Sequence, residues 1–316
     1  MDDRQLSFET DMVGLDANAW LAELDGLCDD LGFFEQLGSG HFAGFLEAGN
    51  NLLVTFETVD QARLHNVDSE PRGFAYARHD GWSHLCLLSM GESWFRDKAV
   101  CDFFDRLVDD GFFEDFERII FYGANGAGYA AAAFSVAAPG ATVIALRPQA
   151  TLDARLAGWD PRYKVARKQS FTGRYGYAPE MIDGAQNVFI VYDPVQRLDA
   201  AHAALFHKPH VTPLPCPLLG KEIDRAFDRM GIHDVVLKLA MEGALDGKRF
   251  TQLMRARRYD QTYVRTLVNW LMMNEHRKLA VILCDYMLQR GRDKFFAETR
   301  AALLTSDEAY RRPENP

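Results

Sequence analysis

Short runs of apolar residues alternate with amphipathic segments through the first two thirds of the chain. Runs typical of buried strands lie at 84–88, 118–122, 142–146, 188–192 and 211–214. Segments with helical spacing of apolar residues separate them, at 98–109, 129–137 and 198–206. Continuous apolar strands with helices between them are typical of a mostly parallel sheet that is covered on both faces. The pattern therefore predicts an α/β core.

The two ends of the chain depart from this alternation. Apolar residues spaced three and four apart over 16–32 predict a helix that Asp16 caps. Two strand-like runs, 41–47 and 52–58, are joined by a Gly-Asn-containing link that favours a β-hairpin. Beyond about residue 221 only helical segments follow, and one pair of them resembles a single helix-turn-helix unit of a tetratricopeptide repeat.

These patterns predict three parts. We expect an acidic, helical N-terminal segment over 1–40, a hydrolase-like α/β core over 41–221, and a C-terminal helical appendage over 222–316. The appendage is a candidate contact surface for a protein partner.

Charge is spread unevenly over the 316 residues. The formal net charge is −10, and residues 1–40 hold ten acidic residues and one basic residue, so the remainder is nearly neutral. An acidic total argues against a nucleic-acid-binding protein, whose affinity depends on clustered Lys and Arg. The acidic segment favours solubility; docking onto a basic part of the chain is the alternative.

Several other features bound the class of protein. No apolar run is long enough to span a bilayer, and the N-terminus is acidic where a signal peptide is basic, so we expect a cytoplasmic protein. The five cysteines form no Cys-x-x-Cys pair. We therefore expect no disulfide framework, no metal ion and no cofactor.

The most informative stretch is RIIFYGANGAGYAAAAFSVAAPGATVIALRPQATLD, residues 118–153. A strand enters a glycine-rich turn and an alanine-rich helix leaves it. A dinucleotide-binding turn would place glycine where Asn125 stands, and a nucleophile elbow would place serine there. Neither pattern is complete. Because at least three expected strands precede the turn, its place in the chain favours the elbow.

The run FYGANGAGYAAAAFS, with PGATVIALRPQATLD after it, resembles the elbow region of an α/β-hydrolase-like family of bacterial surface-polysaccharide and accessory-secretion proteins. Members of that family read approximately Phe-Tyr-Gly-Ser-Ser-Met-Gly-Gly-Tyr-Ala-Ala. Shorter agreements at LLVTFE, SWFRD and VYDP extend the similarity over roughly 40–235. Relatives are sometimes labelled phosphoadenosine phosphosulfate reductases, but the chain shows neither the nucleotide loop nor the reactive C-terminal cysteine of that activity.

The resemblance implies a Ser-His-Asp triad, which can be carried over position by position. The serine position falls on Asn125, and the acid falls on Asp193, with Asp199 as an alternate. The histidine position falls in a loop that offers Leu219, Gly220 and Lys221. Since an amide is a poor nucleophile and no matching base is present, we expect a degenerate triad and a pseudoenzyme.

Other residues could substitute for the missing groups. Cys216, between two prolines, is chemically capable. His202, His207 and His210 lie between the acid position and the last expected strand, and we expect them to be surface or packing residues.

A basic, aromatic segment at 160–177 follows the elbow region. It is expected near the carboxyl ends of the strands, where ligands bind in such sheets. Its candidate anion-binding residues, together with one at a strand end and one in the late loop, are Arg147, Arg162, Lys164, Arg167, Lys168 and Lys221. A solvated basic helix that pairs with acidic neighbours is the alternative.

The sequence therefore favours a non-catalytic binding or scaffolding protein for an anionic or carbohydrate-related ligand. The alternative is an active hydrolase or acyl-transfer enzyme that acts on esters or acylated sugars through a non-standard site in the same crevice.

Overall fold

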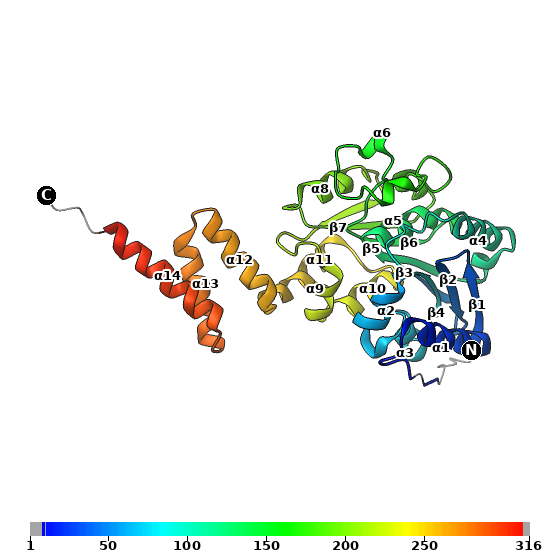
Figure 1. Cartoon of the computed structure of the whole chain (residues 1–316), viewed down its shortest axis with the longest axis horizontal. Helices are drawn as coiled ribbons and strands as arrows, with labels where there is room; N and C mark the ends of the chain where they lie inside the picture. The colour runs from blue at the N-terminus through cyan, green and yellow to red at the C-terminus, as the bar shows by residue number, and fades with distance from the viewer. Residues whose placement is uncertain (1–7, 10, 312–316) are drawn as a thin grey trace.

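The computed structural model describes residues 8–9 and 11–311, the side chains from 306 onward excepted. Within this range the chain forms one eight-stranded sheet with the order β1-β2-β4-β3-β5-β6-β7-β8 (Figure 1). The strands are β1 (Gly32–Leu37), β2 (His41–Leu46), β3 (Asn51–Thr58), β4 (Ser83–Ser89), β5 (Arg118–Ala124), β6 (Thr142–Leu146), β7 (Asn187–Tyr192) and β8 (Val211–Pro215).

The adjacent pairs β4–β3, β3–β5, β5–β6, β6–β7 and β7–β8 are parallel, and the pairs β1–β2 and β2–β4 are antiparallel. All five apolar runs expected as buried strands are strands of this sheet, so the α/β prediction is confirmed. The strand order and the strand-turn-helix after β5 agree with the α/β-hydrolase-type sheet that the resemblance implies.

The hairpin prediction is wrong. β2 pairs with β1 and β4, while β3 lies between β4 and β5, parallel to both. The six residues 52–57 of β3 are all buried, which is the pattern of a central strand. The hairpin of the structure is β1–β2, where Gly38 turns the chain with a φ of 65°. The boundary expected after residue 40 falls inside this hairpin.

The helices of the described chain are α1 (Ala17–Leu31), α2 (Val59–His65), α3 (Phe74–His79), α4 (Lys98–Asp109), α5 (Gly126–Phe134), α6 (Ala154–Ala157), α7 (Ala178–Met181), α8 (Arg197–Ala204), α9 (Ile223–Arg229), α10 (His233–Met241), α11 (Gly247–Leu253), α12 (Gln261–Met273), α13 (Arg277–Arg290) and α14 (Lys294–Arg311). Asp16 caps α1 as expected, accepting from the N–H groups of Asn18 and Ala19. One apolar cluster joins α4, α5 and α7 to the sheet, and a second joins the sheet to α9, α10 and α11.

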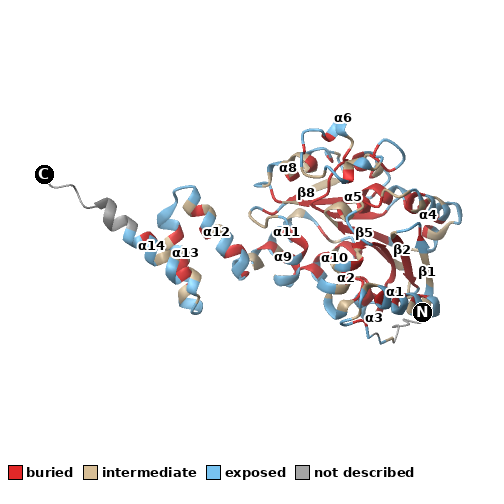
Figure 2. Ribbon diagram, in the orientation of Figure 1, coloured by how far each residue is buried: buried red, intermediate tan, exposed pale blue. Residues whose placement is uncertain are grey.

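The helical appendage begins later than the sequence suggests. Phe227 and Phe250, from α9 and α11, share an apolar cluster with Ile120 and Ile144 of the sheet, so these helices belong to the core. Only α12, α13 and α14 extend away from it, around a cluster of their own (Figures 1 and 2). The likeness to a tetratricopeptide unit stays a prediction. In the described residues no helix combines the length and the apolar character needed to cross a membrane.

Candidate functional site

The turn between β5 and α5 has the strained geometry of a nucleophile elbow. Asn125 has φ 60° and ψ −123°, a conformation that residues with a side chain rarely adopt. A Cβ on Gly123 would lie 2.2 Å from the carbonyl oxygen of Ala127, and one on Gly128 would lie 2.9 Å from that of Leu146. Only glycine fits these close approaches, which explains the spacing that the sequence shows.

The side chain of Asn125 is held from one side. Its Oδ1 accepts a hydrogen bond from Nε of Arg147 at 2.6 Å. Arg147 follows β6, is buried, and lies 3.5 Å from a carboxylate oxygen of Asp199. Because Oδ1 already accepts a hydrogen bond from Arg147, the side-chain group of Asn125 available to a ligand is its NH2, a hydrogen-bond donor.

Asp193, at the acid position, is fully buried. Its Oδ1 accepts from the N–H groups of Val195 at 2.9 Å and Leu218 at 3.1 Å, and its Oδ2 accepts from that of Gly220 at 2.7 Å. The structure thus brings the acid position against the loop that should carry the histidine. The contacts run to backbone N–H groups, and Lys221 of that loop is exposed.

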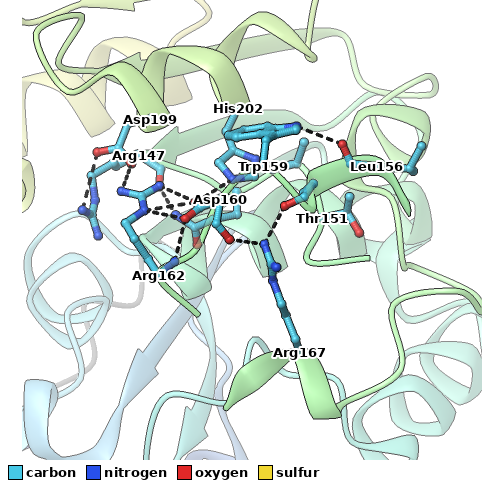
Figure 3. Close-up of polar contacts among 12 residues, drawn as sticks. Arg147, Thr151, Leu156, Trp159, Asp160, Arg162, Arg167, Asp199 and His202 are labelled. Carbon is cyan, nitrogen blue, oxygen red and sulfur yellow. Dashed lines mark hydrogen bonds and ion pairs between the residues drawn. The ribbon is translucent and has the colours of Figure 1, made fainter. Parts of the chain in front are cut away.

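The basic segment after β6 folds into a polar network that we call the loop-side network (Figure 3). Its members are Arg147, Asp160, Arg162, Asp199 and His202. Arg162 holds Asp160 through two parallel hydrogen bonds, Nε–Oδ1 at 3.0 Å and Nη2–Oδ2 at 2.7 Å, and reaches Asp199 Oδ1 at 2.6 Å. Burial alone would raise the pKa of Asp160, but the hydrogen bonds from Arg162 outweigh it and lower that pKa.

His202 closes this network. Its Nδ1 accepts from the N–H of Ala150 at 3.2 Å, so its Nε2 carries the proton and donates to Asp160 at 3.1 Å. Burial lowers the pKa of His202, and the hydrogen bond to Asp160 opposes that shift. The imidazole is therefore a neutral packing element, as expected from the sequence.

The candidate anion-binding residues of the segment separate into two kinds. Arg162 serves the buried carboxylates, and Arg167 donates to the carbonyl oxygens of Ala157 and Asp160. Lys164 and Lys168 are exposed on the surface. Of the alternative interpretation, the helix is absent, since the segment is irregular apart from a 3-10 turn at Ala166–Lys168, but pairing with acidic neighbours is present at Arg162.

The remaining substitutes for triad residues lie apart from Asn125. Cys216 is fully buried, and burial raises the pKa of its thiol, which keeps it protonated. His210 contacts the carbonyl oxygen of Ile182 at 3.0 Å, and His207 is exposed. Within the described residues no cluster of three His, Cys, Asp or Glu side chains could hold a metal ion.

A cavity of about 270 Å³ opens beside Asn125, and no member of the loop-side network lines it. It lies at the carboxyl ends of β3, β4 and β5, where ligands bind in parallel sheets. Its lining residues are Thr58, Asp60, Gln61, His65, Asn66, Arg72, Ser89, Gly91, Glu92, Ser93, Trp94, Phe95, Ala124, Asn125, Gly126, Ala127, Glu222, Asp224, Arg225 and Asp228.

A second polar network, which we call the cavity-side network, supports this cavity. Its members are Glu57, Asn66, Arg72, Asp228 and His233. Arg72 donates to both oxygens of Asp228, at 3.1 and 3.2 Å, and its backbone N–H donates to Glu57 at 3.0 Å. Asp228 also lies 2.7 Å from Nδ1 of His233. Burial would raise the pKa of Asp228, but His233 and Arg72 lower it.

Buried polar atoms of this network have no partner among the described residues. They are Nε of Arg72, Nε2 of His233 and the neighbouring hydroxyl of Tyr122. Buried polar groups are ordinarily paired, so such atoms mark a place where water or a ligand completes the structure. Sequence inspection missed these residues because they come from three distant segments; the one available signal was that polar residues follow β3 and β4 at their carboxyl ends.

Comparison with known proteins gives likenesses of fold. No family model and no curated protein sequence matches the chain. An acylaminoacyl peptidase of Pyrococcus horikoshii is similar with a TM-score of 0.44 and 8% identity, over 69% of this chain and 42% of that one. A glycosylation-associate protein (Gap123) complex from Streptococcus agalactiae has values of 0.42 and 9%, over 65% and 45%.

An esterase from Pyrobaculum calidifontis is similar with a TM-score of 0.38 and 11% identity, over 80% of this chain and 94% of that one. The chain spans less than half the length of the first two proteins. At these scores the likenesses carry no argument about activity, and the site must be interpreted from its own residues.

Proposed function

We propose that this chain binds a polyhydroxylated ligand of carbohydrate type in the cavity beside Asn125, where the elbow supplies hydrogen-bond donors and no nucleophile. The observation that carries the proposal is the mixed polar lining of the cavity. Carboxylates of Asp60, Glu222 and Asp224 accept hydrogen bonds, while the amides of Gln61 and Asn66 donate and accept. Sugar hydroxyls also donate and accept, so this lining suits them.

The charge of the lining favours a saccharide over a small anion, the two ligand classes expected from the sequence. Five acidic residues line the cavity against two arginines, and Arg72 is already paired with Asp228. Three of the five carboxylates have an arginine partner, but acidic residues outnumber arginines in the lining. An anion would meet this excess of negative charge, which is electrostatically unfavourable. A neutral or amine-bearing sugar meets no such repulsion.

The elbow fits a binding role. Asn125 has no ionisable hydroxyl, its Oδ1 is occupied by Arg147, and its amide lines the cavity. The first N–H groups of α5, which have no partner within the helix, begin at the same place. These donors belong to the same lining as the carboxylates of α9 and of Glu222 before it.

Isothermal titration calorimetry with neutral sugars, amino sugars, uronic acids and inorganic phosphate tests this proposal. We expect a neutral or amino sugar to bind, and Asp224→Asn to weaken that binding about tenfold, the effect of losing one charge-assisted hydrogen bond. The matched control is Asp183→Asn, the same chemical change at an exposed residue outside the cavity lining. Binding of phosphate or uronic acids alone, or equal affinity in the two variants, would contradict the proposal.

A further inference from the structure

The cavity beside Asn125 contains a serine that the proposed binding role does not use. Oγ of Ser93 lies 2.7 Å from Nε2 of His41. Ser93 is half-buried and lines the cavity, whereas His41 is buried and does not line it. The hydroxyl therefore stands between the imidazole and the cavity.

The sheet sets the two residues side by side. His41 begins β2, and in the antiparallel register it pairs with Ser89, the last residue of β4. The chain leaves β4 there and reaches Ser93 four residues later. The pairing of β2 with β4, which the sequence did not predict, is what brings this histidine to the cavity.

The turn that carries Ser93 is strained and firmly supported. Trp94 and Phe95 have φ values of 50° and 53°, and the N–H of Phe95 donates to Oγ of Ser93 at 3.2 Å. Trp94 packs against Gly126, where a Cβ would lie 3.1 Å from the indole, and its Nε1 donates to Gln149. Strain of this kind persists only where the surroundings fix it, and it concentrates at functional sites.

The protonation state of the imidazole suits a base. Burial lowers the pKa of His41, and the charge of Asp97 opposes that shift. At neutral pH the ring is uncharged. In the tautomer that carries its proton on Nδ1, an atom with no hydrogen-bond partner among the described residues, Nε2 accepts the proton of Ser93. A neutral imidazole within hydrogen-bond reach of a serine hydroxyl is the arrangement that activates serine as a nucleophile.

The same cavity offers groups that stabilise negative charge. Gly126 and Ala127 line it, and they begin the nine-residue helix α5, whose first N–H groups have no partner within the helix. Such N–H groups stabilise the oxyanion that forms when a hydroxyl attacks an ester carbonyl.

We propose that Ser93 and His41 form a nucleophile–base pair that transfers an acyl group from a carboxylic ester of the ligand in this cavity. The inference rests on the proposed function for its ligand class. It places the chemistry on the loop after β4, away from the elbow residue.

In the first step Oγ of Ser93 bonds to the acyl carbon while its proton passes to Nε2 of His41. The ester C–O bond breaks, His41 returns the proton to the leaving alcohol oxygen, and Ser93 is left acylated. Water or an acceptor hydroxyl then attacks the acyl carbon and gives its proton to His41. The bond from carbon to Oγ breaks, and the proton returns to Ser93.

A fluorophosphonate probe, which phosphonylates activated serines with loss of fluoride, tests the pair in the full-length protein. Intact mass and peptide mapping should show one adduct, on Ser93, that is absent in Ser93→Ala. In His41→Gln the labelling rate should fall at least 100-fold, the lower range for loss of a general base. Ser170→Ala, a change at an exposed serine outside the cavity, should label like wild type.

The wild-type result decides the inference even if a variant misfolds. No adduct on Ser93 in a protein that melts cooperatively, with a serine esterase fully labelled in the same tube, overturns it. If sugars then still bind, the proposed function stands without the acyl transfer. If Ser93 is labelled while no sugar binds, the nucleophile stands and the ligand class proposed above is wrong.

Discussion

The loop-side network and the cavity-side network differ in how their arginines are paired and in whether they border a cavity. In the loop-side network Arg162 makes hydrogen bonds to two carboxylates, of Asp160 and Asp199, which are almost completely buried (Figure 3). In the cavity-side network the guanidinium of Arg72 bonds one carboxylate, that of Asp228 in the cavity lining, and its Nε has no partner among the described residues.

This difference shows why a run of basic residues is weak evidence for an anion site. An arginine can neutralise acids of its own chain, and here Arg162 pairs with Asp160 within the run and with Asp199 beyond it. The charged residues of the cavity-side network come from segments far apart in the chain, so no local run of charged residues predicts this network.

Among the changes that test the difference between the two networks, removal of Arg162 should have the largest effect on stability. We expect Arg162→Leu to lower the free energy of unfolding by about 3 kcal/mol, because Asp160 and Asp199 then stay buried with an incomplete set of partners. Urea unfolding measures the loss. Lys164→Leu, at an exposed lysine two residues away, should change stability by no more than about 0.5 kcal/mol. Equal effects of the two changes would show that the loop-side network is not structural.

The pH dependence of stability tests the cavity-side network, which extends into the core of the protein through Thr55 and His84. Oγ1 of Thr55 donates to Glu57 at 3.1 Å and contacts Nε2 of His84 at 2.9 Å. Burial lowers the pKa of His84 to about 3. Its unfolded pKa is about 6.5, so the unfolded chain binds the proton first. The stabilisation is complete above that value and is lost as the pH falls from about 6.5 towards 3.

Between pH 7 and pH 5 this one residue should cost about 2 kcal/mol of stability. Urea unfolding at the two pH values, in wild type and in His84→Gln, isolates its contribution. The glutamine variant should lose about 2 kcal/mol less than wild type over the same interval. An identical pH dependence in both proteins would mean that His84 has the same pKa in the folded and the unfolded chain.

The sheet could be predicted because its strands are encoded locally. The continuous apolar runs that form β4 to β7 are buried on both faces of the sheet, and this pattern is visible in the sequence of each strand by itself. Strand pairing is a non-local property, so the link at 48–51 suggested a hairpin that does not form. The same holds for α9 to α11, whose helical pattern does not show that they pack on the sheet.

Part of the candidate site could likewise be predicted from local sequence, and part of it depends on non-local strand pairing. The elbow could be predicted because its close contacts demand Gly123 and Gly128 at fixed spacing. Ser93 and His41 could not be paired from the sequence, since 52 positions separate them and only the β2–β4 register joins them. The sequence presented Arg162 as a ligand-binding residue. In the structure it pairs with Asp160 and Asp199, and the pairing with Asp199 is a non-local contact that the sequence does not show.

Asn125 contacts the loop-side network through Arg147 and also lines the cavity. Its backbone strain can be measured apart from its side-chain contact. Asn125→Ala and Asn125→Gly both remove Oδ1 and deprive Arg147 of the same hydrogen bond. Only alanine keeps a Cβ at φ 60° and ψ −123°. Strain of this kind costs about 1–3 kcal/mol, and the greater freedom of glycine in the unfolded chain offsets about 0.4–1 kcal/mol of it.

We therefore expect the glycine variant to be about 1 kcal/mol more stable than the alanine variant in urea unfolding. Because the lost hydrogen bond is common to both variants, it cancels in the comparison, and the difference reports the strain less the gain in freedom of glycine in the unfolded chain. If the alanine variant were as stable as the glycine variant, the turn would have relaxed after loss of the hydrogen bond from Arg147. The elbow conformation would then depend on the loop-side network. If glycine is more stable, the conformation is set by β5, α5 and the close contacts of Gly123 and Gly128, and Asn125 is presented to the cavity by the fold itself.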